Sequence, residues 1–464
     1  MRLLENLWGC RFKPVAISAT IGLIVFSLCA QSRGQNNGGY GYDDRGYYSR
    51  AVGGVAIDAE GLLNTARVDD LGKLRQLRLQ ALEQIPEELN ANVSARKISL
   101  RRLNAAVEDC LAQKKPIPDA IKYLAGLQRI EYVFVYPEQK DIVLVGPGEG
   151  WKVDSKGNVV GATTDWPVML FDDLLVALRT ARDAAHGGIL CSIDPTPEGL
   201  ARMNQQLPEL QQTGDPKLLA AGLEKALGMQ RISLHGVPDT SHFARVLVAA
   251  DYRMKRLAMN FEPSPIRGLP SYLQMAPTTG GVQSPRFWLE PKYDDLLRDA
   301  DGLAYQFRGP GVKAMTEEDY IAAGGKVEHT GKTSKAAQRW AELMTEKYAQ
   351  LAVADPIFGQ LQNCMELAVV AALLVKERLP EKAGCSLPTL FDSPDLKPQV
   401  FYAPKQVESK ASVLKKGRHW VISASGGVAI HSWAIADKVH PDDKPLELRQ
   451  RAVPRQDDAA WWWN

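Results

Sequence analysis

Hydrophobic residues along this chain change between two spacings, one typical of helices and the other typical of strands. Residues 100–111 carry apolar side chains at helical spacing directly after Ser99, which is a good helix N-cap. Residues 129–136 and 141–145 are instead short runs of β-branched and aromatic residues with a turn between them, which predicts a hairpin. The chain is therefore expected to have a mixed α/β fold of the α+β kind, in which several β-hairpins pack with amphipathic helices.

The same spacings place further elements along the chain. The expected helices are 119–126, 172–185, 334–353 and 356–379. The expected strands and hairpins are 151–160, 188–193, 230–234, 286–312, 400–402 and 419–435.

A stretch rich in proline, glycine and serine, residues 263–285, predicts a boundary within the chain. It separates an N-terminal mixed α/β region, 51–262, from a C-terminal hairpin and helical region, 286–437, so that we expect two to three domains or subdomains. A charged tail, 438–464, ends in Trp461-Trp462-Trp463-Asn464. This end is expected either to be disordered or to dock through its aromatic residues on a partner or a lipid interface.

An Asp-x-x-Gly spacing occurs three times, at 58–61, 154–157 and 299–302. A calcium loop needs about six oxygen ligands within a dozen residues, and each of these segments offers too few carboxylates. Asp at the first position and Gly at the fourth are instead typical of type I turns between two strands. We therefore predict hairpin turns and no metal site.

The helix expected at 241–257 contains the densest group of reactive side chains, Asp251-Tyr252-Arg253-Met254-Lys255. At about 100° per residue, one stripe of the helix collects its apolar side chains and faces the core. The stripe consists of Phe243, Val246, Leu247, Ala250, Met254 and Leu257. Asp251 and Lys255 then lie together on one flank, so the group is interpreted as an exposed i,i+4 ion pair on a helix surface.

The N-terminal 34 residues have the pattern of a secretory signal peptide. Arg2, Arg11 and Lys13 precede an apolar run, 15–30, that is too short to span a bilayer, and no second run of that apolarity follows it. A Gly/Tyr-rich linker, 35–50, is expected to be a flexible tether. We expect an extracytoplasmic protein, periplasmic or secreted, whose mature chain has no transmembrane span.

Composition limits the functional classes. The chain has 464 residues, of which 45% are hydrophobic, and its formal net charge is +2, so we expect a globular protein with no nucleic-acid role.

Beyond the signal there are four cysteines, Cys110, Cys191, Cys364 and Cys385. They are expected to be either buried thiols or disulfides, with the Cys364–Cys385 pair the most local.

The linear signatures of common enzymes and metal or nucleotide sites are missing, so we predict no cofactor and no metal. The Ser-x-x-Lys matches at 94–97 and 412–415 lack their companion motifs and are discounted. The best enzymatic alternative is Cys364 with His431 and Asp437, whose order along the chain is similar to that of papain-like and transglutaminase-like hydrolases. The competing interpretation is that Cys364 is an inert core thiol and His431 a structural residue.

Three segments carry a family resemblance. Residues 123–137, 141–151 and 241–255 resemble a family of paralogous exported proteins in planctomycete bacteria, which is a domain of unknown function. The resemblance runs from about residue 53 to residue 435 and implies an extracytoplasmic bacterial protein, without indicating any catalytic residue.

The residues therefore favour an uncharacterised exported protein with a non-catalytic binding or cell-envelope-associated role. Its partner is expected to be a macromolecule or a part of the envelope. A Cys-His-Asp hydrolase or transferase is the alternative.

Overall fold

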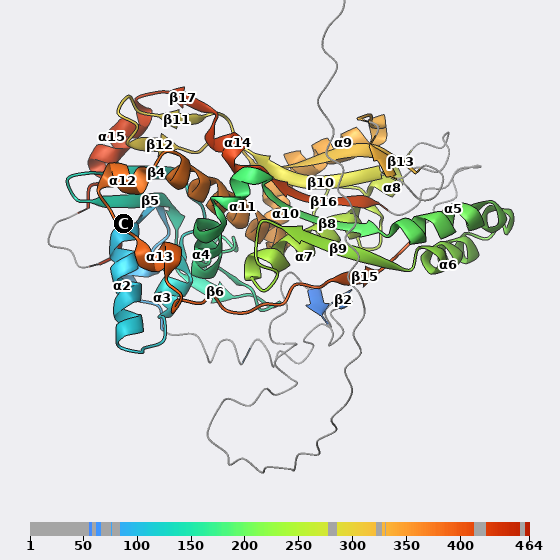
Figure 1. Ribbon diagram of the computed structural model, residues 1–464, viewed down its shortest axis with the longest axis horizontal. Coiled ribbons are helices and arrows are strands. Elements are labelled where there is room, and N and C mark those ends of the chain that lie inside the picture. Colours follow the sequence, from blue (N-terminus) through green and yellow to red (C-terminus); the bar gives the residue numbers. More distant parts are fainter. Residues whose placement is uncertain are drawn as a thin grey trace, which may run out of the picture. The chain divides into compact units, whose positions relative to one another are not determined.

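A computed structural model describes residues 55–57, 62–65, 76, 84–276, 285–321, 327–329, 331–412, 424–454 and 460–464 (Figure 1). The predicted signal peptide and linker lie outside these ranges, as does the first Asp-x-x-Gly segment, 58–61. The fold is mixed α/β, which confirms the predicted class.

The larger sheet has nine described strands in the order β1-β2-β15-β9-β8-β16-β10-β13-β14. Their bounds in that order are Val55–Ile57, Leu62–Thr65, Gln406–Glu408, Met229–His235, Ile189–Pro195, Ser425–Ile430, Pro285–Lys292, Gly311–Ile321 and Val327–His329. In its centre, β16 is antiparallel to β8 and parallel to β10 (Figure 1). Gly426 allows this close pairing, because its φ is +127° and a Cβ there would overlap the Phe287 carbonyl group.

The smaller sheet has seven described strands in the order β17-β11-β12-β4-β5-β3-β18. Their bounds in that order are Val439–Pro441, Leu296–Arg298, Ala304–Gln306, Tyr132–Tyr136, Asp141–Gly148, Val93–Ser99 and Trp462–Trp463. The predicted hairpin is present as β4 and β5, with Tyr136 opposite Asp141. A separate two-stranded hairpin, β6 and β7, spans Trp151–Val153 and Val159–Gly161.

Three helices, α4, α7 and α11, contact one another in the interior. They span Phe171–Thr180, His242–Ala258 and Pro356–Lys376. The remaining α-helices are α2 Leu100–Ala112, α3 Asp119–Lys122, α5 Pro197–Gln212, α6 Pro216–Leu227, α8 Tyr272–Met275, α9 Lys335–Glu346, α10 Tyr348–Ala354, α12 Leu379–Ala383, α13 Pro388–Asp392, α14 Ser432–Ala436 and α15 Lys444–Arg451. The predicted cap of α2 is confirmed, because the Ser99 hydroxyl accepts a hydrogen bond from the Arg102 amide at 3.0 Å.

Helix α11 links the two sheets. It contacts β10 and β13 of the larger sheet, and its Glu366 carboxylate accepts a 2.8 Å hydrogen bond from the Ile130 amide, just before β4 of the smaller sheet. Among the described helices, α11 alone is long and apolar enough to cross a membrane by length and composition. However, 94% of its most apolar window is buried inside the protein, as is typical of a core helix.

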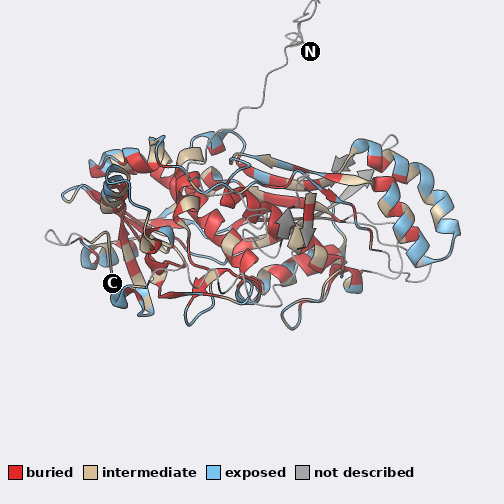
Figure 2. Ribbon diagram, turned by 90° about the horizontal axis from the view of Figure 1, so that it is seen from below, coloured by how far each residue is buried: buried red, intermediate tan, exposed pale blue. Residues whose placement is uncertain are grey.

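Helices α5 and α6 form a hairpin between β8 and β9 whose outer faces are largely exposed (Figure 2). They have a small apolar core of their own. It contains Leu200, Met203, Leu219, Leu223, Ala226, Leu227 and Ala411.

The two described Asp-x-x-Gly segments are turns, as predicted. In each, the Gly amide donates a 3.1 Å hydrogen bond to the Asp carbonyl oxygen, and the φ of Gly157 and Gly302 is +84° and +66°. The predicted strand 419–435 is wrong over its last residues, since β16 ends at Ile430 and α14 begins at Ser432. Residues 400–402 form no strand, although the Phe401 amide donates to the Thr240 carbonyl oxygen at 2.8 Å.

The four C-terminal residues are ordered against the chain itself. Trp462 and Trp463 pair with Ile98 and Lys97 of β3, and the Ser99 amide donates to the Trp461 carbonyl oxygen at 2.9 Å. Neither expectation for this end, disorder or docking on a partner, describes this position.

Candidate functional site

Cys364 lies in the ninth position of α11 and its side chain is completely buried. Burial, followed by the nearby Asp173 carboxylate, raises the pKa of its thiol well above the ordinary value. The Asp173 carboxylate that acts on the thiol belongs to α4. The thiol is therefore neutral at physiological pH and closed to solvent.

Asp437 and His431, the two partners predicted for Cys364, lie elsewhere. The Asp437 carboxylate pairs with Lys376 at 2.7 Å, at the C-terminal end of α11 and about 18 Å along the helix axis from Cys364. His431 directly precedes α14, is exposed, and lies beside Gly188 at the start of β8. Among the described residues, neither side chain has a hydrogen bond or ion pair with Cys364.

A different histidine shares a buried cluster with Cys364. His242, the first residue of α7, places its Nδ1 atom 2.9 Å and 3.1 Å from the two oxygens of Asp173, and Phe401 packs edge-on against its ring. The carboxylate thus lies between the imidazole and the thiol. In a catalytic triad the imidazole instead lies between the carboxylate and the nucleophile, and it takes the proton of the nucleophile. This cluster instead joins three helices through polar contacts.

Asp251 and Lys255 are buried, so their predicted exposure is wrong. The Lys255 ammonium donates to Asp251 Oδ2 at 3.1 Å and to the carbonyl oxygens of Ile193 and Gly426 at 2.7 Å and 3.1 Å. Burial raises the pKa of Asp251 to about 7, against the opposing effect of Lys255. The cavity beside Lys255 measures 30 Å³, which is room for about one water molecule.

The prediction of exposure assumed that only the apolar stripe of this helix is buried. Helix α7 contacts β8, β16 and β10 of the sheet and also α4, α8 and α11, so 14 of its 17 residues are buried. Arg253, from the same predicted group, pairs with Asp355 at 2.6 Å and with Glu262. These side chains hold α7 in place and do not converge on a common reaction centre.

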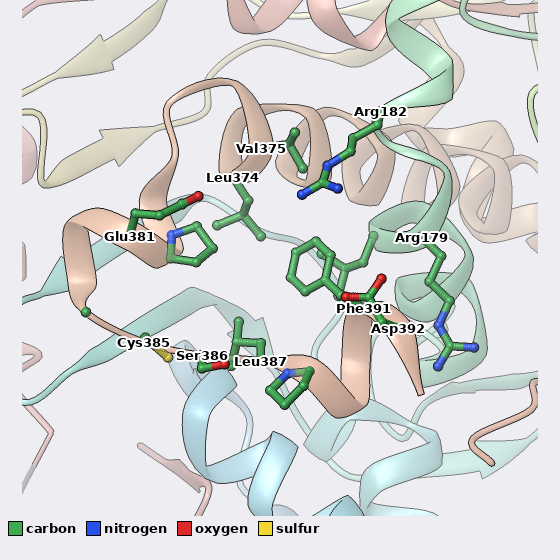
Figure 3. Close-up of a pocket in the computed structure, with 14 residues that line it drawn as sticks. Arg179, Arg182, Leu374, Val375, Glu381, Cys385, Ser386, Leu387, Phe391 and Asp392 are labelled. Atoms are coloured by element: carbon green, nitrogen blue, oxygen red, sulfur yellow. The ribbon is translucent and has the colours of Figure 1, made fainter. Parts of the chain in front are cut away.

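A pocket with a volume of 520 Å³ lies between α4, α11, α12 and α13 (Figure 3). Buried leucines contribute its apolar lining together with the half-buried Phe391. These leucines are Leu178, Leu374 and Leu387. All of its lining residues belong to the described ranges, and they come from two segments, 178–182 and 374–392, that are more than 190 residues apart.

Two arginines line the pocket with different roles, Arg179 in the last turn of α4 and Arg182 two residues beyond its end. Arg179 donates to the carbonyl oxygens of Leu390 and Leu396 at 3.0 Å and 2.8 Å and thereby fixes the α13 segment. Arg182, three residues later, is exposed and has no hydrogen-bond or ion-pair partner among the described residues. Figure 3 shows its guanidinium group and the Phe391 ring directed into the pocket. No linear motif joins these residues, so the sequence offered nothing that could have found the pocket.

A second depression, of 540 Å³, lies beside His186 and His235. Its lining combines Thr180, Asp183 and the two histidines with Val237 and Pro238. Across the described parts of the chain, no three His, Cys, Asp or Glu side chains are grouped so that they could hold a metal ion.

The four cysteines beyond the predicted signal are free thiols, of which Cys191, Cys364 and Cys385 are buried as expected and Cys110 is only partly buried. Cys385 lines the 520 Å³ pocket, and burial raises the pKa of its thiol to about 12. It is therefore a neutral side chain there.

Comparison with known proteins gives one match. Residues 191–272 match a family described as a protein of unknown function, DUF1598. The matched segment runs from β8 to α8 and includes Asp251 and Lys255. No curated protein and no solved structure matches the chain.

Proposed function

We propose that this chain is an exported, non-catalytic binding protein that acts outside the cytoplasm, in association with the cell envelope. The observation that carries the non-catalytic part is the enclosure of Cys364, the only cysteine for which a nucleophile arrangement was predicted. A thiol attacks as the thiolate, and both burial and the Asp173 carboxylate disfavour that form.

The hydrolase alternative needs an imidazole within hydrogen-bond reach of the thiol. Within the described residues, the imidazole of this cluster is that of His242, and it pairs with the Asp173 carboxylate. That arrangement leaves no imidazole of the cluster paired with the thiol to take its proton. It supports a structural role for all three side chains.

The binding part of the proposal is supported by the 520 Å³ pocket, whose volume lies in the range of about 300–1,000 Å³ that small-molecule sites occupy. It mixes apolar side chains with a few charged ones, as such sites do. The proposal of export is supported by the charged start and apolar run of residues 1–34. The nearly balanced charge favours a partner other than nucleic acid.

The test is thiol labelling of the folded chain with iodoacetamide between pH 5 and 9, with the adducts mapped by mass spectrometry. Cys110 is partly exposed and serves as the internal positive control, whereas Cys191 is a buried control. We expect Cys110 to be labelled in the folded protein and Cys364 only after denaturation.

Rapid labelling of Cys364 near pH 6 would overturn the proposal if His431→Ala abolished it, because that result requires an activated thiolate. The same labelling abolished by His242→Ala would also overturn it and would assign the base to His242.

A further inference from the structure

We infer that the pocket between α4, α11, α12 and α13 binds a small amphipathic carboxylate, with the carboxylate at Arg182 and the apolar body against Phe391 and the accessible side chains of Val375, Pro380 and Pro388. This inference rests on the proposed binding function and names the chemical class of its ligand.

The charges around the pocket favour an anion at one point. Four of its lining residues are charged, namely Arg179, Arg182, Glu381 and Asp392. Glu381 pairs with Arg378 at 3.8 Å, and Asp392 acts on Arg179, partly offsetting the lowering of its pKa by burial. Arg182 is therefore the one lining charge that has no counter-charge among the described residues.

Arg182 is suited to a carboxylate in particular. A guanidinium group presents paired N–H donors in a planar fork that matches the two oxygens of a carboxylate. Arg179, near the end of α4, also lines the pocket, but its guanidinium group donates to main-chain oxygens of Leu390 and Leu396 and its charge is opposed by Asp392, which leaves Arg182 as the anchor for an anion. A dianion such as phosphate is less suited, because the carboxylates of Glu381 and Asp392 also line the pocket and would repel a second negative charge.

The apolar part of the ligand has a preformed surface. Leu178, Leu374 and Leu387 are at most 4% exposed and form a packed floor. Val375 and Pro380 are half-buried and Pro388 is exposed, so these three side chains present apolar surface to a ligand. Phe391 is only half-buried and leaves ring surface free for contact with a ligand (Figure 3). Each CH₂ group of the ligand that is transferred from water to this surface should lower the dissociation constant about fourfold.

The experiment is isothermal titration calorimetry on the full chain with octanoate. Acetate is the carboxylate without an apolar body, 1-octanol is the apolar body without a charge, and inorganic phosphate represents a dianion. We expect octanoate to bind at least tenfold more tightly than each of the other three.

Variants then assign the site. Arg182→Gln should weaken octanoate binding at least tenfold and leave that of 1-octanol unchanged, and Arg182→Lys should restore part of the loss. Ser386→Trp, at an exposed lining position, should fill the pocket and abolish binding. Arg451→Gln is the matched control, since Arg451 is an exposed arginine outside the pocket.

Octanoate binding that is equal in Arg182→Gln and the unaltered chain would overturn the inference, and so would 1-octanol or phosphate binding as tightly as octanoate. Absence of octanoate binding would overturn it as well. If octanoate does not bind and Cys364 stays unlabelled in the folded chain, the proposal of a non-catalytic binding protein stands, and only the class of its ligand is wrong. Labelling of Cys364 overturns the proposed function whatever octanoate does.

Discussion

Lys255 is a buried cation whose hydrogen-bonding capacity is fully used. An ammonium group has three donors, and it meets three acceptors here, the carboxylate of Asp251 and the main-chain oxygens of Ile193 and Gly426. Because the two carbonyl groups belong to the neighbouring strands β8 and β16, one side chain ties α7 to both. Asp251 Oδ1, by contrast, has no hydrogen-bond partner among the described residues.

Removal of this cation should be strongly destabilising. Lys255→Met leaves the Asp251 carboxylate buried and unpaired, and we expect the free energy of unfolding to fall by about 3–5 kcal/mol in urea melts. Arg451→Met is the control, since Arg451 and Glu447 are also an i,i+4 pair but are each 77% exposed, and its effect should be below about 1 kcal/mol. Similar small effects in both variants would mean that Lys255 is exposed in solution.

The sequence could not show this burial, for a physical reason. Hydrophobic periodicity identifies the side of a helix that is richest in apolar residues, and Phe243 and Met254 on that stripe are indeed buried. It does not show that a second layer covers the other side. Asp251 has the same sequence pattern as any surface acid four residues before a lysine, and only the packing of β8 and β16 against this side of α7 distinguishes the two cases.

At the scale of secondary-structure elements, predictions succeeded where the determining contacts are local. The β4–β5 hairpin and the Ser99 cap depend on residues close in sequence, and both are present. Strand β16 lies between β8 and β10, although it follows them by more than 130 residues, and no local pattern specifies those pairings. The two-residue strand β18 is too short to give any periodicity at all.

Strand β18 supplies the next prediction, because its pairing covers an edge of the smaller sheet that would otherwise be open. The Arg96 guanidinium group packs over the Trp462 ring, and its central carbon atom, Cζ, lies 5.5 Å from the ring centroid. We expect Trp462→Ala to lower the free energy of unfolding by about 1–3 kcal/mol, through lost burial and a lost cation–π contact. Tyr402→Ala, at a 62% exposed aromatic residue, should change it by less than about 0.5 kcal/mol. Equal effects of the two substitutions in denaturant melts would argue against docking of the C-terminal residues.

At the scale of the whole molecule, the fold joins distant segments in both sheets. Strands from both sides of the predicted boundary at 263–285 pair in each sheet, for example β8 with β16 and β4 with β12. The pocket likewise combines α4 with α11, α12 and α13. The fold class depends on which segments are helices and which are strands, and local sequence patterns predict that. The pocket depends on which distant helices pack against one another, and local patterns do not predict that. The sequence therefore predicted the class of the fold but not its candidate binding site.

The proposed location outside the cytoplasm gives the last prediction, which concerns residues 1–34. An apolar run of 16 residues is shorter than the roughly 20 that span a bilayer, so the segment should be cleaved after export. Small residues precede two predicted cleavage points, after Ser32 and after Gly34, and Ser32 contributes to both. Mass spectrometry of the exported chain from its native host should find an N-terminus between Gln31 and Gln35.

Ser32→Lys should make the precursor accumulate, because a bulky charged side chain then occupies a position that requires a small one at both cleavage points. Gln31→Lys, a change at the neighbouring unconstrained position, should still be processed, and an intact Met1 in the membrane fraction of the unaltered chain would contradict the proposal of a cleaved signal.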